Sequence, residues 1–304
     1  MRKCWRTVPR AVAPVIAMSV LGCTAMAGCA TTGPAHPGAV AVVASTAVWG
    51  SVARAVAGEH IAIRSILGGT DADPHSYQAT AADAAALADA DLVIYNGGGY
   101  DPWVDRVLAG RPGMQKVDAF SYLGPVNEAP DEHVFYNLTV AKAVAATIAE
   151  RLAVIDPAHS MEYRTSATEF GRGADAIATS ERAIATAYPA TGVIATEPVV
   201  HYLLTASGLI NRAPAAFAEA NENDDDPAPA DMAAVLDMIS RRDVAALLVN
   251  PQTATPATAD LQAAARRAGV PVTEVSENLP GGSDYLTWQR DTVNQLTAAL
   301  RSAR

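Results

Sequence analysis

Short apolar runs rich in β-branched residues alternate with longer alanine-rich segments along most of this 304-residue chain. The short runs have the length and composition of buried strands, and the longer segments have the spacing of helices. Strands separated by helices pair in parallel, so the sequence predicts an α/β fold with two lobes, each with a mainly parallel sheet flanked by helices. The pattern covers 40–44, 48–57, 61–67, 79–90 and 92–95, and it returns at 192–195, 199–206, 231–241, 245–249, 258–268, 272–275 and 285–300.

The segment between the two lobes contains no strand-like run. Residues 138–155 and 160–187 are helical in composition, with Asp156-Pro157 as the clear break between them. At 1.5 Å per residue, a helix over 160–187 would be roughly 40 Å long, enough to run along both lobes. We therefore expect an N-terminal lobe over 39–137, a helical segment over 138–188 with one long linking helix, and a C-terminal lobe over 189–304.

The N-terminal residues have the features of an export signal. A basic start precedes the apolar run 11–21, which is too short to span a bilayer as a stable helix. Met26-Ala27-Gly28-Cys29 resembles a bacterial lipobox, in which the cysteine is lipidated and the preceding residues are removed. Cys23 is a competing site, disfavoured because Leu21 is bulky beside the cut, and an ordinary secretory signal is a third interpretation. We expect a signal peptide over 1–28, a lipid on Cys29 and a flexible tether over 29–38.

The composition and net charge indicate which kinds of molecule the protein is suited to bind. Half of the residues are hydrophobic and 18% are charged, which is typical of a globular chain. The formal net charge of −10 argues against nucleic acid as a partner and modestly favours cations. An acidic surface alone does not make a metal site, however. A metal site can be predicted only from specific ligand residues.

Four polar side chains stand at the ends of predicted strands or the starts of predicted helices: His75, His133, Glu197 and Asp284. In open α/β sheets, ligands bind outside the carboxyl ends of the strands. Taken singly these residues are weak signals, and Asp284 could equally serve as a helix N-cap. Together, two imidazoles and two carboxylates suit a divalent first-row ion better than magnesium or calcium.

These segments resemble the zinc and manganese solute-binding proteins of ABC importers, the cluster A-I family. Residues 73–80, Asp-Pro-His-Ser-Tyr-Gln-Ala-Thr, are similar to the family's Asp-Pro-His-x-Tyr-Glu-Pro-Thr, and 90–97 with Trp103 resemble the strand and loop that come next. Residues 131–134 are similar to the family's Asp-Pro-His-x-Trp, although Glu132 replaces the usual proline. Glu197 stands where zinc importers usually have histidine and manganese or iron importers often have glutamate. Residues 282–285 look like the final Asp-Ser-Tyr segment.

The resemblance implies a function and a set of ligands. It implies His75, His133, Glu197 and Asp284 as the ligands of a transported Mn²⁺ or Zn²⁺ ion, with Mn²⁺ favoured. It also implies a non-enzymatic, monomeric protein that delivers the ion to a permease with its cytoplasmic ATPase. The protein would be exported and held by its lipid at the outer face of the cytoplasmic membrane, periplasmic or on the cell surface.

Several alternatives stay open from the residues alone. His201 lies one helical turn after Glu197 and could replace it as the third ligand. The acid-rich segment 219–226 lacks the spacing of an EF-hand, so we expect a solvated loop at the rim of the cleft. Rival functions are binding of a chelated metal or organic ligand, for which 6% aromatic residues are few, surface adhesion, and metal-dependent hydrolysis, for which no His-Glu-x-x-His motif is present.

Overall fold

Two four-stranded parallel sheets organise the chain in the computed structural model, which describes residues 40–69, 73–124, 130–223 and 225–303. The predicted signal peptide, tether and Cys29 lie outside these residues. The first sheet has the order β2-β1-β3-β4 and the second the order β6-β5-β7-β8, and every pairing is parallel. The predicted fold class is confirmed. The strands are β1 (Val42–Thr46), β2 (Ile63–Leu67), β3 (Leu92–Tyr95), β4 (Lys116–Asp118), β5 (Gly192–Ala195), β6 (Ile210–Asn211), β7 (Leu247–Val249) and β8 (Val272–Glu274).

The helices cover these sheets and connect them. The α-helices are α1 (Ala47–Ala57), α2 (Ala81–Ala88), α3 (Pro102–Leu108), α4 (Leu138–Ile155), α5 (Ser160–Ala187), α6 (His201–Ala206), α7 (Ala215–Glu222), α8 (Pro229–Arg241), α9 (Pro256–Ala268) and α10 (Tyr285–Ser302). Short 3-10 turns are η1 (Phe120–Tyr122), η2 (Val134–Tyr136), η3 (Pro157–His159), η4 (Pro198–Val200) and η5 (Pro251–Thr253). None of the described helices is both long enough and apolar enough to cross a membrane.

The two sheets share one topology. In each, the first strand lies between the second and the third, so the order reverses at β1/β3 and at β5/β7. Ligands bind at such a switch point, beyond the carboxyl ends of the strands. The edge strands β4 and β6 are only three and two residues long, which is too short for a periodic sequence signal, and our sequence analysis did not predict them.

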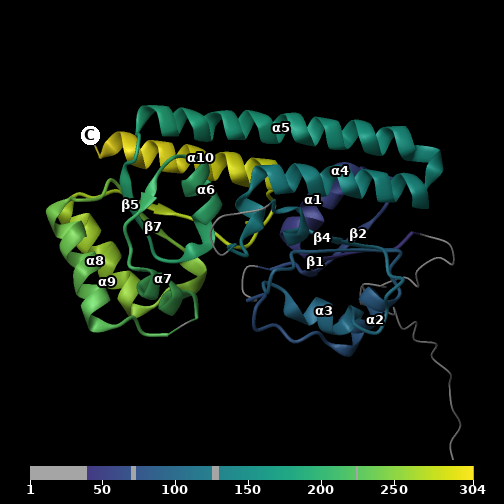
Figure 1. Cartoon of the computed structure of the whole chain (residues 1–304), viewed down its shortest axis with the longest axis horizontal. Helices are drawn as coiled ribbons and strands as arrows, with labels where there is room; N and C mark the ends of the chain where they lie inside the picture. The colour runs from purple at the N-terminus through teal and green to yellow at the C-terminus, as the bar shows by residue number, and fades with distance from the viewer. Residues whose placement is uncertain (1–39, 70–72, 125–129, 224, 304) are drawn as a thin grey trace, which may run out of the picture. The chain divides into compact units, whose positions relative to one another are not determined.

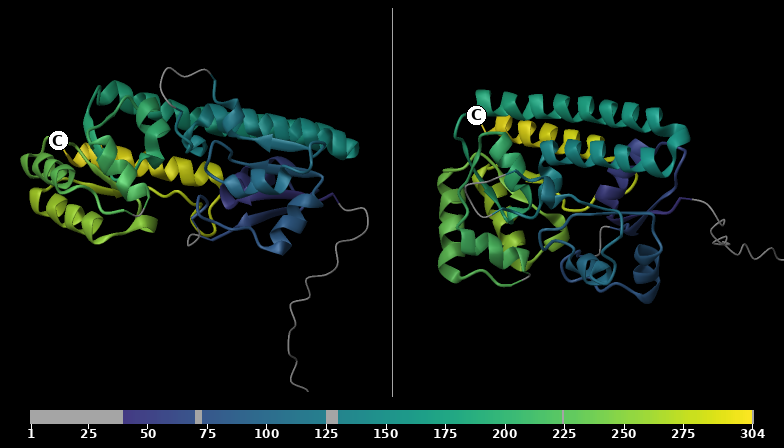
Figure 2. Two further views of the ribbon diagram at one scale, coloured as in Figure 1. Left: turned by 60° about the horizontal axis from the view of Figure 1, so that its bottom comes forward. Right: turned by 45° about the vertical axis from the view of Figure 1, so that its right-hand side comes forward.

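Helix α5 is the predicted long helix. It runs along both sheets, with α4 and α10 packed beneath it (Figure 1), and the three helices stay together in both views of Figure 2. One hydrophobic cluster joins strands of both sheets, such as Val42 and Val193, to Phe170 on α5 and Leu296 on α10. This continuous apolar packing restrains motion of one sheet relative to the other, because separating them would expose buried side chains.

Glu181 is an unusual member of this packed region. It lies on α5, is only 3% exposed, and its Oε1 atom has no hydrogen-bond partner among the described residues. Burial raises the pKa of this carboxyl from 4.5 to about 7. Because the folded state holds the proton more tightly than the unfolded state, Glu181 costs no stability below pH 4.5. The cost grows between pH 4.5 and 7 and is complete above pH 7.

Replacement of Glu181 by glutamine removes this ionisation. The variant should gain stability over the unaltered protein as pH rises. We expect the difference between their free energies of unfolding to be roughly 2 kcal/mol more in favour of Glu181→Gln at pH 8 than at pH 5. Urea denaturation at both pH values measures the difference, with the exposed Glu169→Gln on the same helix as the control. A relative stability that is the same at both pH values would contradict the prediction.

Candidate metal centre

His75 and His133 occupy loops of the same local construction. In each loop an aspartate two residues earlier accepts hydrogen bonds from the backbone N–H and the ring Nδ1 of the histidine. The distances are 2.9 and 2.9 Å for Asp73 with His75, and 2.9 and 2.9 Å for Asp131 with His133. A carboxylate on one ring nitrogen fixes the orientation of the imidazole and leaves the other nitrogen for a metal. In both residues, the nitrogen left for the metal is Nε2.

The local fold holds the second of these loops firmly. Asn96, which follows β3, donates from its side chain to the carbonyl oxygen of Glu132 at 2.8 Å, and Trp49 on α1 donates to the Asn96 side chain at 3.1 Å. Downstream, Asn137 caps α4 by accepting from the backbone N–H groups of Thr139 and Val140. His133 is thereby placed beside the switch point of the first sheet, with 2% of its side chain exposed.

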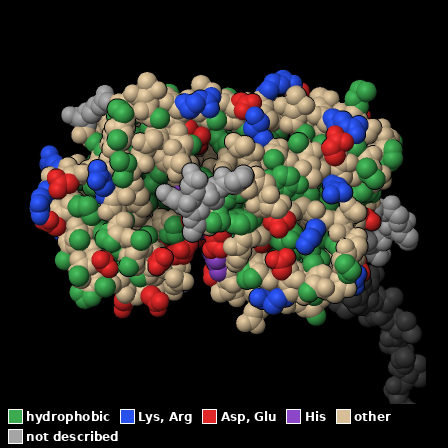
Figure 3. Space-filling model, viewed as in Figure 1, with side chains coloured by type: hydrophobic (Ala, Val, Ile, Leu, Met, Phe, Trp, Pro, Cys, Tyr) green, Lys and Arg blue, Asp and Glu red, His purple; other side chains and the backbone are tan. Residues whose placement is uncertain are grey.

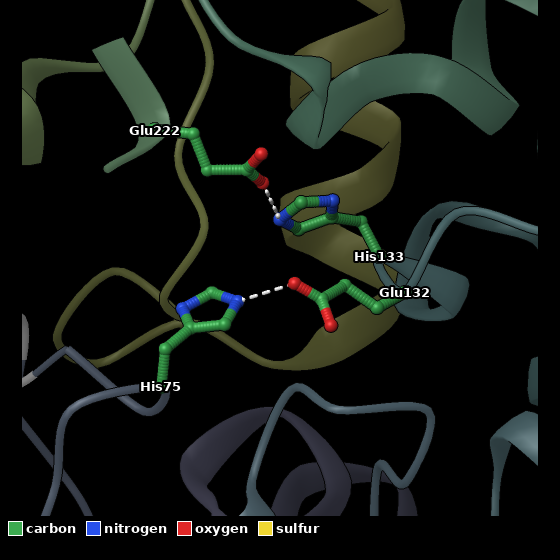
Figure 4. A group of neighbouring side chains, drawn as sticks. All are labelled: His75, Glu132, His133 and Glu222. Carbon is green, nitrogen blue, oxygen red and sulfur yellow. Dashed lines mark hydrogen bonds and ion pairs between the residues drawn. The ribbon is translucent and has the colours of Figure 1, made fainter. Parts of the chain in front are cut away.

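Each Nε2 faces a carboxylate (Figure 4). Glu132 lies 2.7 Å from Nε2 of His75, and Glu222 lies 3.4 Å from Nε2 of His133. Glu222 is the last residue of α7 and so comes from the second lobe. One ligand atom from each of these four side chains lies within 4.8 Å of the others. Imidazoles of the first lobe and a carboxylate of the second therefore meet at one point.

Glu197 lies in the same cavity, at the carboxyl end of β5. It is 3% exposed, and it accepts hydrogen bonds from the Asn250 side chain at 2.9 Å and from the Thr253 hydroxyl. Since Asn250 directly follows β7, this pair marks the switch point of the second sheet. Burial raises the pKa of Glu197 to about 7, and the charges of Glu277 and Glu222 add to the shift.

The cavity has a volume of about 960 Å³. In Figure 3 a histidine and several acidic side chains gather at the notch between the lobes. Among the described residues that line the cavity there is no lysine or arginine. An excess of negative charge with no balancing cation attracts metal ions. The ionisable lining residues are Asp73, His75, His133, Glu197, Glu222, Glu274, Glu277 and Asp291.

Glu277 is a residue of this cavity that our sequence analysis did not single out. It is 9% exposed, and its Oε1 lies 3.9 Å from Nδ1 of His75. Its charge contributes to the raised pKa values of both His75 and His133. Its position just beyond the carboxyl end of β8 could have identified Glu277 from the sequence. The rule that ligands bind beyond the carboxyl ends of parallel strands had already pointed to Glu197.

Asp284 and His201 lie elsewhere. The Asp284 carboxylate caps α10, accepting from the backbone N–H of Thr287 at 2.9 Å and from its hydroxyl at 2.7 Å. His201 is exposed at the start of α6 and stacks edge-on against Tyr202. Neither is among the described residues that line the cavity, although Ser283 is. The assignment of Asp284 as a ligand stays a prediction.

The acid-rich segment differs from the expected solvated loop, because residues 219–222 form the last turn of α7 and Glu222 faces the cavity. Glu219, Asp225 and Asp226 are exposed as expected, but 23% of the Glu222 side chain is exposed and it points at His133. Burial raises its pKa to about 7, although the charge of His133 opposes the shift. Glu222 lies one helical turn after the buried Ala218, at the edge of the buried face of α7, which explains why this acid of the segment faces inward.

His75 holds its proton more tightly than a free imidazole does. Burial alone would lower the pKa of His75, but hydrogen bonds to Glu132 and Asp73, with the charges of Glu132 and Glu277, raise it to about 9. An imidazole must be neutral to bind a metal, so a bound ion displaces this proton. Metal affinity is therefore expected to weaken as pH falls.

Asp131 orients the His133 ring through a hydrogen bond to Nδ1. We expect Asp131→Asn to lower metal affinity about 10–100-fold, because loss of an orienting carboxylate has effects of this size at metal sites. Competition against a chromophoric chelator measures the affinity, and Asp260→Asn, an exposed acid on α9, is the control. Unchanged affinity in Asp131→Asn would show that the ring is held by its packing alone.

Two parallel α/β lobes along one long helix, with ligand-type side chains facing each other at the strand ends, define a two-lobed solute-binding protein. The chain belongs to the family of the zinc-uptake complex component A, periplasmic, whose model matches residues 42–299. The resemblance seen in the sequence motifs is confirmed. This is a family of solute-binding proteins rather than enzymes.

Individual relatives agree with this assignment. The manganese ABC transporter substrate-binding lipoprotein PsaA of Streptococcus mitis is 27% identical over 143 residues, 42% of this chain and 46% of that protein. The manganese-binding lipoprotein MntA of Bacillus subtilis (strain 168) is 27% identical over 157 residues, 48% and 51% of the two chains. The chain thus spans about half the length of the curated relatives it matches. The periplasmic zinc binding protein TroA from Treponema pallidum shares the fold, with a TM-score of 0.71 and 20% identity, covering 86% of this chain and 99% of that one.

Proposed function

We propose that this protein captures Mn²⁺ or Zn²⁺ outside the cytoplasmic membrane and delivers it to the permease of an ABC importer. The observation that carries the proposal is the convergence of two oriented imidazoles and carboxylates from both lobes in one cavity. The relatives named for manganese and zinc support both ions as cargo. Oxygen-rich ligands suit Mn²⁺, while the intrinsic order of affinities still favours Zn²⁺.

The proposed ligands are His75, His133 and Glu197, with a fourth carboxylate from the loop between β8 and α10. The sequence motif favours Asp284 for that place, and position in the cavity favours Glu277. A bare cation fits this lining better than a chelated metal or an organic ligand would. Such ligands commonly need aromatic or cationic side chains, and the described lining residues include one tryptophan and no lysine or arginine.

Delivery requires that the ligands separate. His75 and His133 come from the first lobe, and Glu197 and the loop between β8 and α10 from the second, so a small movement of second-lobe loops opens the coordination sphere. The shared hydrophobic cluster limits larger motion. A lipid on Cys29 would hold the protein, as a monomer, at the outer face of the membrane, close to its permease.

Metal content and transport test the proposal together. Protein released from its native host is expected to contain one Mn²⁺ or Zn²⁺ per chain by plasma mass spectrometry, and His75→Ala is expected to contain none. Cells that produce only His75→Ala should take up the same metal more slowly than cells with the unaltered protein. Absence of stoichiometric metal from the unaltered protein, or equal uptake by both strains, would contradict the proposal.

A further inference from the structure

The centre contains more carboxylates than four ligands require. Glu132 and Glu222 each keep about a quarter of the side chain exposed (25% and 23%), and we term them the outer pair. Glu197 is 3% exposed as a whole residue and the Glu277 side chain is 12% exposed, and we term them the inner pair. Glu222 and the inner pair line the same cavity as both imidazoles, and Glu132 contacts His75.

The outer pair contacts the nitrogens that a metal would use. Glu132 lies against Nε2 of His75 and Glu222 against Nε2 of His133, and the ligand atoms of all four side chains lie within 4.8 Å of one another. Two ligands on opposite sides of a first-row ion are about 4.4 Å apart, since each bond is about 2.2 Å long. An ion bound by both imidazoles therefore needs only small side-chain movements to reach both outer carboxylates.

We propose that Glu132 and Glu222 are further ligands of the transported ion and select Mn²⁺ over Zn²⁺. This inference rests on the proposed function. Zn²⁺ at a closed site is satisfied by four tetrahedral ligands, and in this proposal the two imidazoles and the inner pair are those four. Mn²⁺ prefers six ligands rich in oxygen, and the outer pair raises the number of available side chains to six.

The electrostatic cost of gathering four carboxylates does not remove this preference. Repulsion among them is present before either ion binds and is relieved by either divalent cation, so it contributes equally to both affinities and cancels in their ratio. The number of ligands that each ion can accept does not cancel. Selectivity therefore depends on the outer pair even though overall affinity depends on all six side chains.

The test compares two affinities in the full-length protein, purified from membranes. The double variant Glu132→Gln/Glu222→Gln is expected to bind Mn²⁺ at least about tenfold more weakly and Zn²⁺ less than about threefold more weakly, measured by competition with a fluorescent chelator. Glu219→Gln is the matched control, because it removes an exposed charge from the same helix α7 without a contact to either imidazole. It should change neither affinity.

Cobalt provides a readout of ligand number. Co²⁺ absorbs visible light weakly with six ligands and much more strongly with four, so the double variant should be more intensely coloured than the unaltered protein. An equal loss of Mn²⁺ and Zn²⁺ affinity in the double variant, or no change in its cobalt spectrum, would overturn the inference that the outer pair selects Mn²⁺. Either result would leave the proposed function standing. Failure of the unaltered protein to bind either ion would overturn the proposed function, and this inference with it.

Discussion

Replacing His133 with alanine is expected to lower the affinity for both Mn²⁺ and Zn²⁺ by more than about 100-fold, since even the loss of a residue behind a ligand has effects of 10–100-fold. His133 is the most enclosed of the ionisable groups at the centre, with 2% of its side chain exposed and its ring oriented by Asp131. Its removal also leaves Glu222 without the imidazole that faces it. The proposed site loses one of its two imidazole ligands.

Isothermal titration with each ion measures this loss, and the midpoint of thermal unfolding shows whether the variant is folded. His201→Ala is the informative control. It removes an exposed imidazole that the sequence left open as a third ligand, and the position of His201 outside the cavity lining predicts unchanged affinity. Metal bound at full strength by His133→Ala would exclude the proposed centre, and loss of metal in His201→Ala would place the third ligand on α6.

A second large effect is expected at Glu277. Glu277→Gln should lower metal affinity by about 100-fold, since it removes a buried carboxylate beside His75, whereas Asp284→Asn should leave the affinity unchanged. Asparagine caps a helix as well as aspartate does, so Asp284→Asn also preserves the start of α10. Asp284→Ala loses the cap and should lower the free energy of unfolding by about 1 kcal/mol.

The same titrations decide between the two acids. Loss of metal in Asp284→Asn with full binding by Glu277→Gln would establish the ligand that the sequence motif favours. Loss of metal in Glu277→Gln with full binding by Asp284→Asn would establish that the loop after β8 presents Glu277 to the ion and uses Asp284 to cap α10. The two acids cannot be distinguished by residue type, because both are carboxylates on one short loop.

Much of the site was accessible to sequence reasoning because its signals are local. The segments 73–75 and 131–133 each carry an aspartate two residues before a histidine, and this spacing lets the carboxylate hold both the backbone and the ring. Glu197 was found from its place at the end of a strand. The outer pair was not found, because Glu132 and Glu222 show their role only through the imidazoles opposite them.

The sequence by itself determined the alternation of most strands and helices, the parallel sheets, the long helix α5 and the two histidines, while the short strands β4 and β6 escaped it. The elements and the two histidines show local patterns of burial and hydrogen bonding, and parallel pairing follows from the helices that separate the strands. Only the tertiary structure decided which carboxylates face those histidines. The end of α7, the loop after β8 and the loop before α4 are distant in sequence, and their side chains meet because two sheets of the same topology direct their strand ends into one cavity.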